Sequence, residues 1–572
     1  MTPVPATRCR PAAVIGRLAV VVALVAASSG LSNADAAESY QRISGEGSSW
    51  AANAIDAMRV NVRQFGITVD YNPSGSTAGR KNFLNGTVDY AASDIPFQFN
   101  PEDGSAPERP APGSYAYMPI TAGGTAFMYN LLIGGKRVTN LRLSGENVAK
   151  IFTGAIKVWN DPAIQADNPG LVLPARPVVP VVRSDGSGST AQFTKWMINR
   201  HGPIWNDYCQ RSGRAPACGF TSFYPTIPGM IAQSGDLGVS GYVSQGFAEG
   251  AIGYVNYSYA LGAQFPVAKV LNAAGFYTEP TPENVAVSLL KARINTDASK
   301  PETYLTQNLD GVYTDKDPRS YQLSSYSYLI LPTVVAGQFN LAKGRTLGAF
   351  AYYAMCQAQQ QSASLGYSPM PINLVEASFE QIAKVPGVEA QSIDIKSCKN
   401  PTFSADGGNT LAKNAPQPQA CDKKGSASQC PNGTGGLRNV PTAVKADPSA
   451  GGGGGATGDS GGGGSTGDSG GGSDDGVVTT DPTGSIVSGG STTDTVPTEG
   501  GVVDPDTGEY AGGTIDQGVS GLAVGAALPT TLPSRDGWGA PVALLLLVAA
   551  LTLGLVLAPA FTLRHLARRQ QR

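Results

Sequence analysis

The chain has 572 residues, with 41 Lys and Arg against 43 Asp and Glu, so its formal net charge is −2. This balance provides no basic field, and it excludes nucleic acid as a partner because binding to a phosphate backbone depends on clustered Lys and Arg. The length exceeds what one hydrophobic core of ordinary size needs. Gly and Pro are over-represented at 72 and 41 residues, and charged residues make up only 15%. We therefore expect a folded part diluted by a low-complexity part.

The first 37 residues have the composition of a secretory signal peptide. Three arginines, the last of them Arg17, precede the apolar run 18–27, and small residues follow up to Ala37. A run of about ten apolar residues is too short to remain as a membrane-spanning anchor. The pattern therefore predicts export, with cleavage after Ala36 or Ala37.

A second membrane signal lies near the C-terminus. Residues 540–563 contain no charged side chain, and a helix of that length reaches roughly 36 Å at about 1.5 Å per residue, enough to cross a bilayer. Trp538 stands at one boundary, and the basic tail 564–572 follows the other. Because positive residues stay on the cytoplasmic side, we expect a transmembrane helix over 538–563 with a cytoplasmic tail. The rest of the mature chain is then placed on the extracellular face of the cell membrane.

The even number of cysteines outside the signal peptide indicates disulfide bonds in an exported protein. Proximity in the sequence favours the pairs Cys209–Cys218, Cys356–Cys398 and Cys421–Cys430. Since no C-x-x-C pair or His cluster accompanies them, we expect neither a metal site nor a cofactor.

Residues 401–537 are rich in Gly, Ser, Thr and Asp, and apolar periodicity stops at about Asn400. Such a segment cannot bury enough apolar area to offset its ordering entropy, so we expect a disordered tether with a reach of about 60 Å. Its repeated Thr-Gly-Asp-Ser motif occurs at 457–460 and 466–469. Two copies without an apolar position favour a plain linker over a calcium-binding repeat.

Residues 38–400 alternate short apolar runs with helical patterns. Apolar residues at helical spacing over 51–62 precede a strand pattern over 67–71, and a second strand pattern over 178–182 precedes the helical face of Phe193, Trp196 and Met197. Strand, small-residue loop and helix recur in this order. The region therefore predicts an α/β fold with largely parallel sheets.

Three loops rich in Gly and Ser, residues 45–50, 73–79 and 183–190, each precede a predicted helix. Backbone N–H groups and hydroxyls at a helix N-terminus suit an anion, although one such loop alone is more typical of ordinary caps and turns. Three loops together with Asp94 point to a site for a small oxyanion. No loop ends in G-K-[ST], so a nucleotide is not indicated.

Residues 43 to about 395 resemble the substrate-binding protein of the bacterial ABC phosphate uptake system. The segments that carry the resemblance keep one order along the chain, and they are 69–77, 86–94, 151–162, 183–189 and 250–255. The resemblance implies a two-lobe fold with a ligand crevice between the lobes. The first lobe would hold residues 39–118 and 322–400, and the second would hold residues 119–321.

The resemblance also implies a ligand, a partner and a set of binding residues. The protein would bind inorganic phosphate without covalent chemistry and deliver it to an ABC permease. The residues around the anion would be Ser49, Trp50, Ser76, Asp94, Arg183, Ser187, Gly188 and Ser189. Asp185 would hold Arg183 in place rather than contact the ligand.

The chain departs from the family pattern in four places. The family usually has Thr then Phe at positions 49 and 50, and Thr at position 189, where this chain has Ser49, Trp50 and Ser189. The stretch 199–250 matches poorly, and a predicted C-terminal helix replaces a lipid anchor. These last two differences leave coupling to a transporter less well supported than binding.

Two other functions are compatible with parts of the sequence. A secreted hydrolase could use Ser49 or Ser187 as nucleophile, with His201 as the base, but no G-x-S-x-G motif is present. A membrane-tethered surface protein or sensor could bind phosphate without transporting it.

Overall fold

The computed structural model describes residues 40–214, 218–404 and 408–442. The predicted signal peptide, the predicted transmembrane helix and its basic tail lie outside these residues. Within the described ranges, no helix is both long enough and apolar enough to span a bilayer. All described residues belong to one compact unit, residues 1–456.

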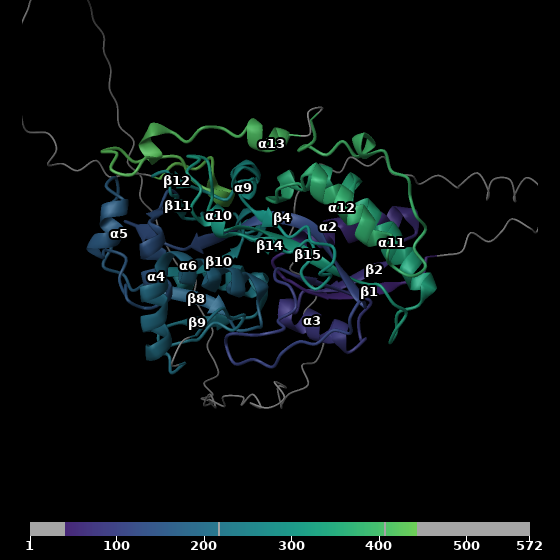
Figure 1. Ribbon diagram of the computed structural model, residues 1–572. Helices are drawn as coiled ribbons and strands as arrows, with labels where there is room; N and C mark the ends of the chain where they lie inside the picture. The colour runs from purple at the N-terminus through teal and green to yellow at the C-terminus, as the bar shows by residue number, and fades with distance from the viewer. Residues whose placement is uncertain (1–39, 215–217, 405–407, 443–572) are drawn as a thin grey trace, which may run out of the picture. The chain divides into compact units, whose positions relative to one another are not determined.

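The centre of this unit is an eight-stranded mixed sheet (Figure 1). Its strands, in spatial order, are β2 (Val69–Asn72), β1 (Ile43–Gly47), β3 (Tyr90–Ser93), β15 (Ser324–Pro332), β4 (Tyr115–Tyr129), β10 (Ala251–Asn256), β8 (Val179–Arg183) and β9 (Ile231–Gln233). Smaller sheets are formed by β12 (Tyr277–Thr278), β11 (Lys269–Leu271) and β7 (Arg142–Leu143), by β13 (Arg293–Ile294) and β14 (Gln307–Asn308), and by β5 (Leu132–Ile133) and β6 (Lys136–Arg137).

Strand β4 connects the two halves of the sheet. Its first part pairs with β15 as far as Gly124, and from Thr125 onward it pairs with β10. All fifteen residues of β4 are buried, as expected for a strand covered on both faces. We call the half with β2, β1 and β3 the first lobe and the half with β10, β8 and β9 the second lobe. The chain leaves the first lobe along β4 and returns along β15.

The prediction of largely parallel sheets is correct only for the outer parts of this sheet. Strands β1, β2 and β3 pair in parallel, as do β10, β8 and β9. At the centre, β4 is antiparallel to both β15 and β10. The reason is topological, because the strand that leaves a lobe and the strand that returns to it run in opposite directions. The predicted lobe boundary at 118/119 lies inside β4, and the one at 321/322 lies just before β15.

Helices pack around the sheet, with α2 and α3 beside β1 and β2 and with α4 and α6 beside β8 (Figure 1). The α-helices are α2 (Ala52–Val62), α3 (Ser76–Leu84), α4 (Gly145–Phe152), α5 (Pro162–Asp167), α6 (Gly188–Arg211), α7 (Gly235–Val243), α8 (Tyr257–Gly262), α9 (Pro282–Leu289), α10 (Asp310–Tyr313), α11 (Leu341–Met355), α12 (Ile372–Ile382) and α13 (Thr410–Lys413). Short 3-10 turns are η1 (Arg63–Phe65), η2 (Gly246–Ala248), η3 (Gln357–Gln361), η4 (Ala363–Leu365), η5 (Ile395–Cys398), η6 (Ala420–Asp422) and η7 (Gly435–Leu437).

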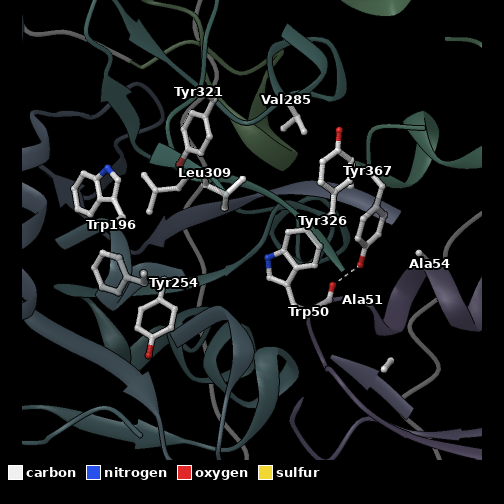
Figure 2. Packing of buried hydrophobic residues seen from close by; sticks show 14 of the residues in the cluster. Trp50, Ala51, Ala54, Trp196, Tyr254, Val285, Leu309, Tyr321, Tyr326 and Tyr367 are labelled. Atoms are coloured by element: carbon white, nitrogen blue, oxygen red, sulfur yellow. Dashed lines mark hydrogen bonds between the residues drawn. The ribbon is translucent and has the colours of Figure 1, made fainter. Parts of the chain in front are cut away.

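The predicted helical face on α6 is confirmed, since Phe193, Trp196 and Met197 are all buried. They join an aromatic core that extends through both lobes. Figure 2 shows this core from Trp196 and Tyr254 in the second lobe to Trp50 and Tyr367 beside the first. One continuous core places the loops of the two lobes close together.

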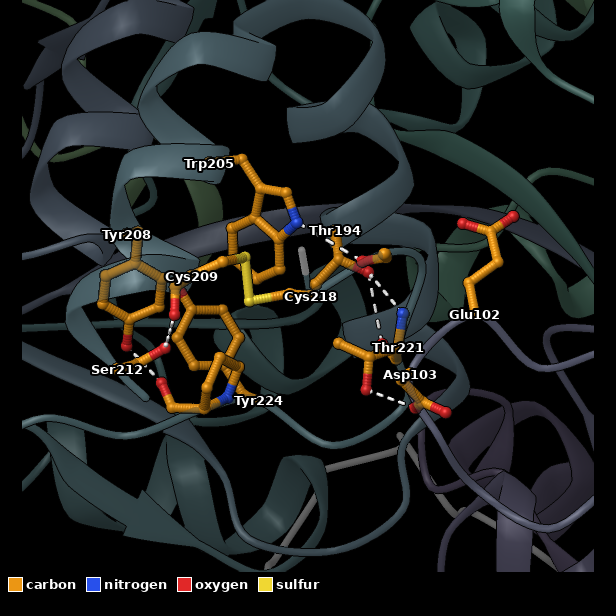
Figure 3. The surroundings of a disulfide bond; sticks show 12 residues. Glu102, Asp103, Thr194, Trp205, Tyr208, Cys209, Ser212, Cys218, Thr221 and Tyr224 are labelled. Atoms are coloured by element: carbon orange, nitrogen blue, oxygen red, sulfur yellow. Dashed lines mark hydrogen bonds between the residues drawn. A yellow bond between two sulfur atoms is a disulfide. The ribbon is translucent and has the colours of Figure 1, made fainter. Parts of the chain in front are cut away.

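All three predicted disulfides are present: Cys209–Cys218, Cys356–Cys398 and Cys421–Cys430. Figure 3 shows the first of them beside Trp205 and Tyr224. Each joins cysteines 9 or 42 residues apart in the sequence, so proximity was a sufficient guide to the pairing.

The predicted linker start at residue 401 is wrong, because residues 408–442 pack on the folded domain. Thr442 accepts a hydrogen bond from the backbone N–H of Thr139 at 2.7 Å, and Asp422 pairs with Lys269 at 2.7 Å. Cys430 is buried as well. This segment is held to the domain by polar contacts and by a small apolar cluster of Ala412 and Ala415 with Ala286 and Val287, and the Cys421–Cys430 disulfide closes a loop within it. Apolar periodicity does not detect so few apolar contacts. The rest of the predicted linker, from residue 443, lies outside the described residues.

Candidate functional site

Four loops, which follow β1, β2, β8 and β9, meet between the two lobes. Each leads into the N-terminus of a helix, and the helices are α2 and α3 of the first lobe and α6 and α7 of the second. The predicted loops at 45–50, 73–79 and 183–190 are three of the four. The fourth, leading into α7, was not predicted.

Glycines allow these loops to approach one another closely. A Cβ on Gly188 would lie 2.5 Å from the Ser76 hydroxyl and 2.7 Å from an Asp94 carboxylate oxygen. Gly75, with φ of +104°, would place a Cβ 2.4 Å from an Asp185 carboxylate oxygen. Both contacts cross from one lobe to the other. A larger residue at either position would therefore force the lobes apart.

Asp94 follows β3 and is buried among hydroxyl groups. The hydroxyls of Ser48 and Ser327 donate to its Oδ1 at 2.6 and 2.8 Å, and the Ser76 hydroxyl donates to its Oδ2 at 3.3 Å. Burial raises the pKa of Asp94 to about 6, although the Ser48 and Ser327 hydrogen bonds act against this rise. The carboxylate is thus largely ionised near neutral pH and can accept a hydrogen bond from a protonated ligand.

Arg183 ends β8 and is also buried. Its Nε and Nη2 donate to the two oxygens of Asp185, and its Nη1 donates to Asp236 at 2.5 Å and to Ser189 at 3.2 Å. Burial alone would lower the pKa of Arg183, but Asp236 and Asp185 raise it above its ordinary value. The predicted contact between Asp185 and Arg183 is therefore present, and the guanidinium stays charged.

Asp236 is the principal residue that sequence reasoning missed. It is fully buried, accepts hydrogen bonds from Ser49 Oγ at 2.7 Å and from Asn256 N at 2.7 Å, and donates its own backbone N–H to Ser49 Oγ at 3.0 Å. Burial raises its pKa. The available signal was the triplet 234–236, Ser-Gly-Asp, which repeats the composition of the other loops at the start of a helix.

Most helices facing the site are not capped by the side chain of their own N-cap residue. The N-cap residues of α2, α3 and α7 make no capping hydrogen bond with their own side chains. At α7, however, Asp185 Oδ1 accepts from Gly235 N and Ser49 Oγ accepts from Asp236 N. Only α6 among the site helices is capped by its own N-cap residue, Ser187, which accepts from Thr190 N at 3.1 Å. Uncapped helix ends leave amide donors for a ligand.

The remaining donors are backbone amides. Among the residues of the predicted ring, all within the described parts of the chain, the backbone N–H groups of Ser49, Trp50, Ser76, Gly188 and Ser189 have no hydrogen-bond acceptor. They lie at or just before helix N-termini, where the helix dipole favours an anion.

Trp50 can contribute only its backbone. Its indole Nε1 donates to Thr125 Oγ1 at 3.2 Å, and its ring contacts the edge of Tyr367 in the core at 6.0 Å between centroids (Figure 2). The side chain is 1% exposed. Its role in the predicted ring is thus limited to the N–H group.

The charges at the site do not balance. One guanidinium, that of Arg183, faces the carboxyl groups of Asp94, Asp185 and Asp236. A fully deprotonated anion would add to an excess of negative charge, whereas an anion that carries a proton can donate it to a carboxylate. The geometry therefore suits a small protonated oxyanion.

The geometry for serine hydrolysis is not formed in the described residues. Ser49 bonds to Asp236 and Ser187 bonds to Ser189, and neither contacts an imidazole. His201 instead packs on Trp196, with 4.8 Å between centroids, and burial lowers its pKa to about 4. The described chain likewise contains no group of three or more His, Cys, Asp or Glu side chains placed to hold a metal ion.

The fold and the loops that meet between its two lobes define a two-lobe α/β binding protein. The family model described as the PBP superfamily domain matches residues 32–358, which is more than half of the chain. The chain therefore belongs to this superfamily, whose model ends before the C-terminal segment that packs on the second lobe.

Among curated proteins, this chain is similar to phosphate-binding proteins. The phosphate-binding protein PstS 2 of Mycobacterium tuberculosis is 31% identical over 312 residues, which cover 54% of this chain and 76% of that protein. The phosphate-binding protein PstS of Xylella fastidiosa is 29% identical over 339 residues, which cover 59% and 83%. A solved high affinity periplasmic phosphate-binding protein (PfluDING) bound with phosphate aligns at 18% identity and a TM-score of 0.47, over 62% of this chain and 100% of its own.

Proposed function

We propose that this protein binds inorganic phosphate outside the cytoplasm and delivers it to an ABC phosphate importer. The ring of Ser49, Trp50, Ser76, Asp94, Arg183, Ser187, Gly188 and Ser189 holds the anion, and Asp185 positions Arg183. One observation carries the proposal: a buried carboxylate, Asp94, lies beside the N-terminus of α3 in the first lobe and that of α6 in the second.

The helix N-termini supply the attraction. Backbone N–H groups and helix dipoles favour negative charge without adding a formal positive charge. Arg183 supplies the one formal charge, and Asp185 and Asp236 fix its orientation. An oxyanion with several acceptor oxygens matches this number of donors.

Asp94 supplies the selectivity. Phosphate keeps a proton near neutral pH and can donate it to Asp94, while sulfate has none and would face an unpaired carboxylate. Titration calorimetry of the full chain against phosphate and sulfate tests the proposal directly. Heat of binding with phosphate and none with sulfate is expected, and absence of phosphate binding would contradict the assignment.

The proposal includes the route to the cell surface. Residues 1–37 direct export, the Gly-rich segment beyond the folded domain is a flexible tether, and the helix 538–563 crosses the membrane with residues 564–572 in the cytoplasm. Protease added to intact cells should release the folded domain by cutting the tether. A domain protected until the membrane is opened would contradict this topology.

The alternative is a tethered surface protein or sensor that binds phosphate but does not feed a permease. The predicted C-terminal helix in place of a lipid anchor supports this alternative. Deletion of the gene followed by measurement of phosphate uptake separates the two. Reduced uptake, restored by the full chain but not by an Asp94→Ala or Arg183→Ala variant, supports transport, and unchanged uptake supports the alternative.

A further inference from the structure

A loop outside the anion ring bridges the two lobes. Residues 98–110, between β3 and β4, extend from the first lobe to the segment 218–224 of the second (Figure 3). The Thr221 hydroxyl donates to Asp103 Oδ2 at 2.6 Å, and the backbone N–H of Phe220 donates to Glu102 Oε2 at 3.1 Å. Both hydrogen bonds connect one lobe to the other.

The first-lobe side of this bridge is held by Arg80. Its guanidinium is buried, and its Nε lies 3.0 and 2.9 Å from the two oxygens of Glu108. Glu108 also closes the loop on itself, because its Oε2 accepts from the backbone N–H of Gln98 at 2.6 Å. The loop therefore has a fixed base on α3.

The same arginine connects the loop to the anion ring. Arg80 lies one helical turn after Ser76 on α3, and its Nη1 donates to Ser93, the neighbour of Asp94, at 2.9 Å. Any displacement of the loop base would thus act on the two first-lobe segments that face the anion. A buried ion pair that loses its geometry is costly, so these segments and the loop should move together.

On the second lobe, the segment 218–224 that receives the loop is linked to α6. The disulfide Cys209–Cys218 joins the segment to α6, and the Ser222 carbonyl accepts from the backbone N–H of Ser187 at 2.9 Å. Ser187 caps the helix whose first residues belong to the ring. The receiving segment therefore moves with the second-lobe half of the site.

The two sides fit closely. A Cβ on Gly219 would lie 2.6 Å from Glu102 Cβ and 2.8 Å from its backbone oxygen. Thr221 is 1% exposed and Asp103 is half-buried, so their hydrogen bond is partly shielded from water. Hydrogen bonds to a charged group contribute more than neutral ones.

We infer that residues 98–110 form a latch that holds the lobes closed over the anion, with Asp103 and Thr221 as positioning residues that do not contact it. This inference rests on the proposed function in that phosphate is the ligand whose release the latch slows. Separation of the two lobes must break the Asp103–Thr221 and Glu102–Phe220 contacts. The latch therefore sets the dissociation rate, while the open state that captures phosphate is unaffected.

The test compares variants of the full chain in the presence of inorganic phosphate. Thr221→Val and Asp103→Ala should raise the phosphate dissociation rate about three- to tenfold and leave the association rate unchanged. Thr221→Ser and Asp103→Asn keep a hydroxyl donor and an acceptor oxygen, so they should restore most of the slow dissociation. Ser105→Ala, in the same loop, should match the parent because no side-chain contact is lost.

Hydrogen exchange provides a readout that does not depend on phosphate. Peptides covering residues 98–105 and 218–224 should exchange faster in Asp103→Ala and Thr221→Val than in the parent. A dissociation rate and an exchange pattern unchanged from the parent would overturn the latch while leaving phosphate binding intact. If the parent binds no phosphate, the proposed function fails, and exchange alone decides whether the two segments hold the lobes together.

Discussion

The two lobes contribute different chemistry to the candidate site. The first lobe supplies Asp94, surrounded by the hydroxyls of Ser48, Ser76 and Ser327, with no cation among them. The second lobe supplies Arg183, which two carboxylates already hold. The first lobe can therefore recognise the protonation state of an anion, whereas the second recognises its charge. Selectivity and affinity should respond separately to changes in the two lobes.

Among these variants, Asp94→Asn should have the largest effect. It should reduce the selectivity for phosphate over sulfate, to which the first lobe contributes Asp94. An unpaired buried carboxylate facing sulfate costs several kcal/mol, which corresponds to a preference of about a thousandfold or more. The amide removes the charge and supplies a donor, so the gap between phosphate and sulfate should narrow, chiefly because sulfate is admitted. Calorimetry with both anions on both proteins measures the gap.

Asp89→Asn is the matched control. Asp89 is a buried carboxylate of the same lobe, paired with Lys343 and Ser44. Its replacement should leave selectivity unchanged. An Asp94→Asn protein that rejects sulfate as strongly as the parent would refute the role of Asp94.

The raised pKa of Asp94 predicts a pH effect on stability without ligand. Because burial raises the pKa to about 6, against about 3.9 in an unfolded chain, the folded state binds the proton more tightly. The resulting stabilisation is fully present below about pH 4 and is lost as the pH rises through 6. Relative to Asp94→Asn, the parent should lose roughly 2 to 3 kcal/mol of unfolding free energy between pH 4 and 7.

Denaturant unfolding of both full-length proteins across this range gives that difference. Asp236 also has a raised pKa, and its charge helps to raise the pKa of Asp94, so the difference between the two proteins reports Asp94 together with its coupling to Asp236. A difference that stays constant with pH would show that the Asp94 carboxyl is not shielded from water.

Arg183→Ala should reduce phosphate affinity, because it removes the positive charge that the second lobe contributes to the site. Hydrogen bonds to a charged group are worth about 1.5 to 3 kcal/mol, so phosphate affinity should fall ten- to a hundredfold. Discrimination against sulfate should persist because Asp94 is intact. Calorimetry on the folded fraction measures both quantities, and unchanged affinity would remove Arg183 from the site.

Arg142→Ala controls for the loss of a buried arginine. Arg142 lies in the second lobe, is equally buried and pairs with Asp422. Its loss should lower the melting temperature while leaving phosphate affinity unchanged. The two arginines thus separate destabilisation from loss of binding.

Ser49→Ala should have the smallest effect, because it removes a hydroxyl that links the lobes through Asp236. The two hydrogen bonds that are lost go to Asp236 and not to the anion, and the backbone N–H of residue 49 remains, so the effect on affinity is indirect and should be about fivefold, or about 1 kcal/mol. Ser49→Thr should retain the parent affinity. A loss as large as that of Arg183→Ala would show that the link, rather than the charge, dominates binding.

Much of the fold follows from local patterns in the sequence. Period-3.6 spacing located α2, apolar runs located β2 and β8 within one or two residues, and proximity was enough for the disulfides. These features depend on residues close together in the chain. Local patterns missed the packed segment 408–442, because its contacts with Thr139 and Lys269 span more than 150 residues.

The candidate site also has features that local sequence predicts and features that it does not. Gly and Ser before helix starts are visible in the sequence, because a helix N-terminus is a local feature that leaves amide donors free. Asp236 is 53 residues from Arg183 and 187 from Ser49, and no local pattern connects them. The sequence alone determined which loops could bind an anion. The tertiary structure decided which carboxylates meet these loops and which latch residues meet across the lobes, because the crossings at β4 and β15 bring distant segments of the two lobes together.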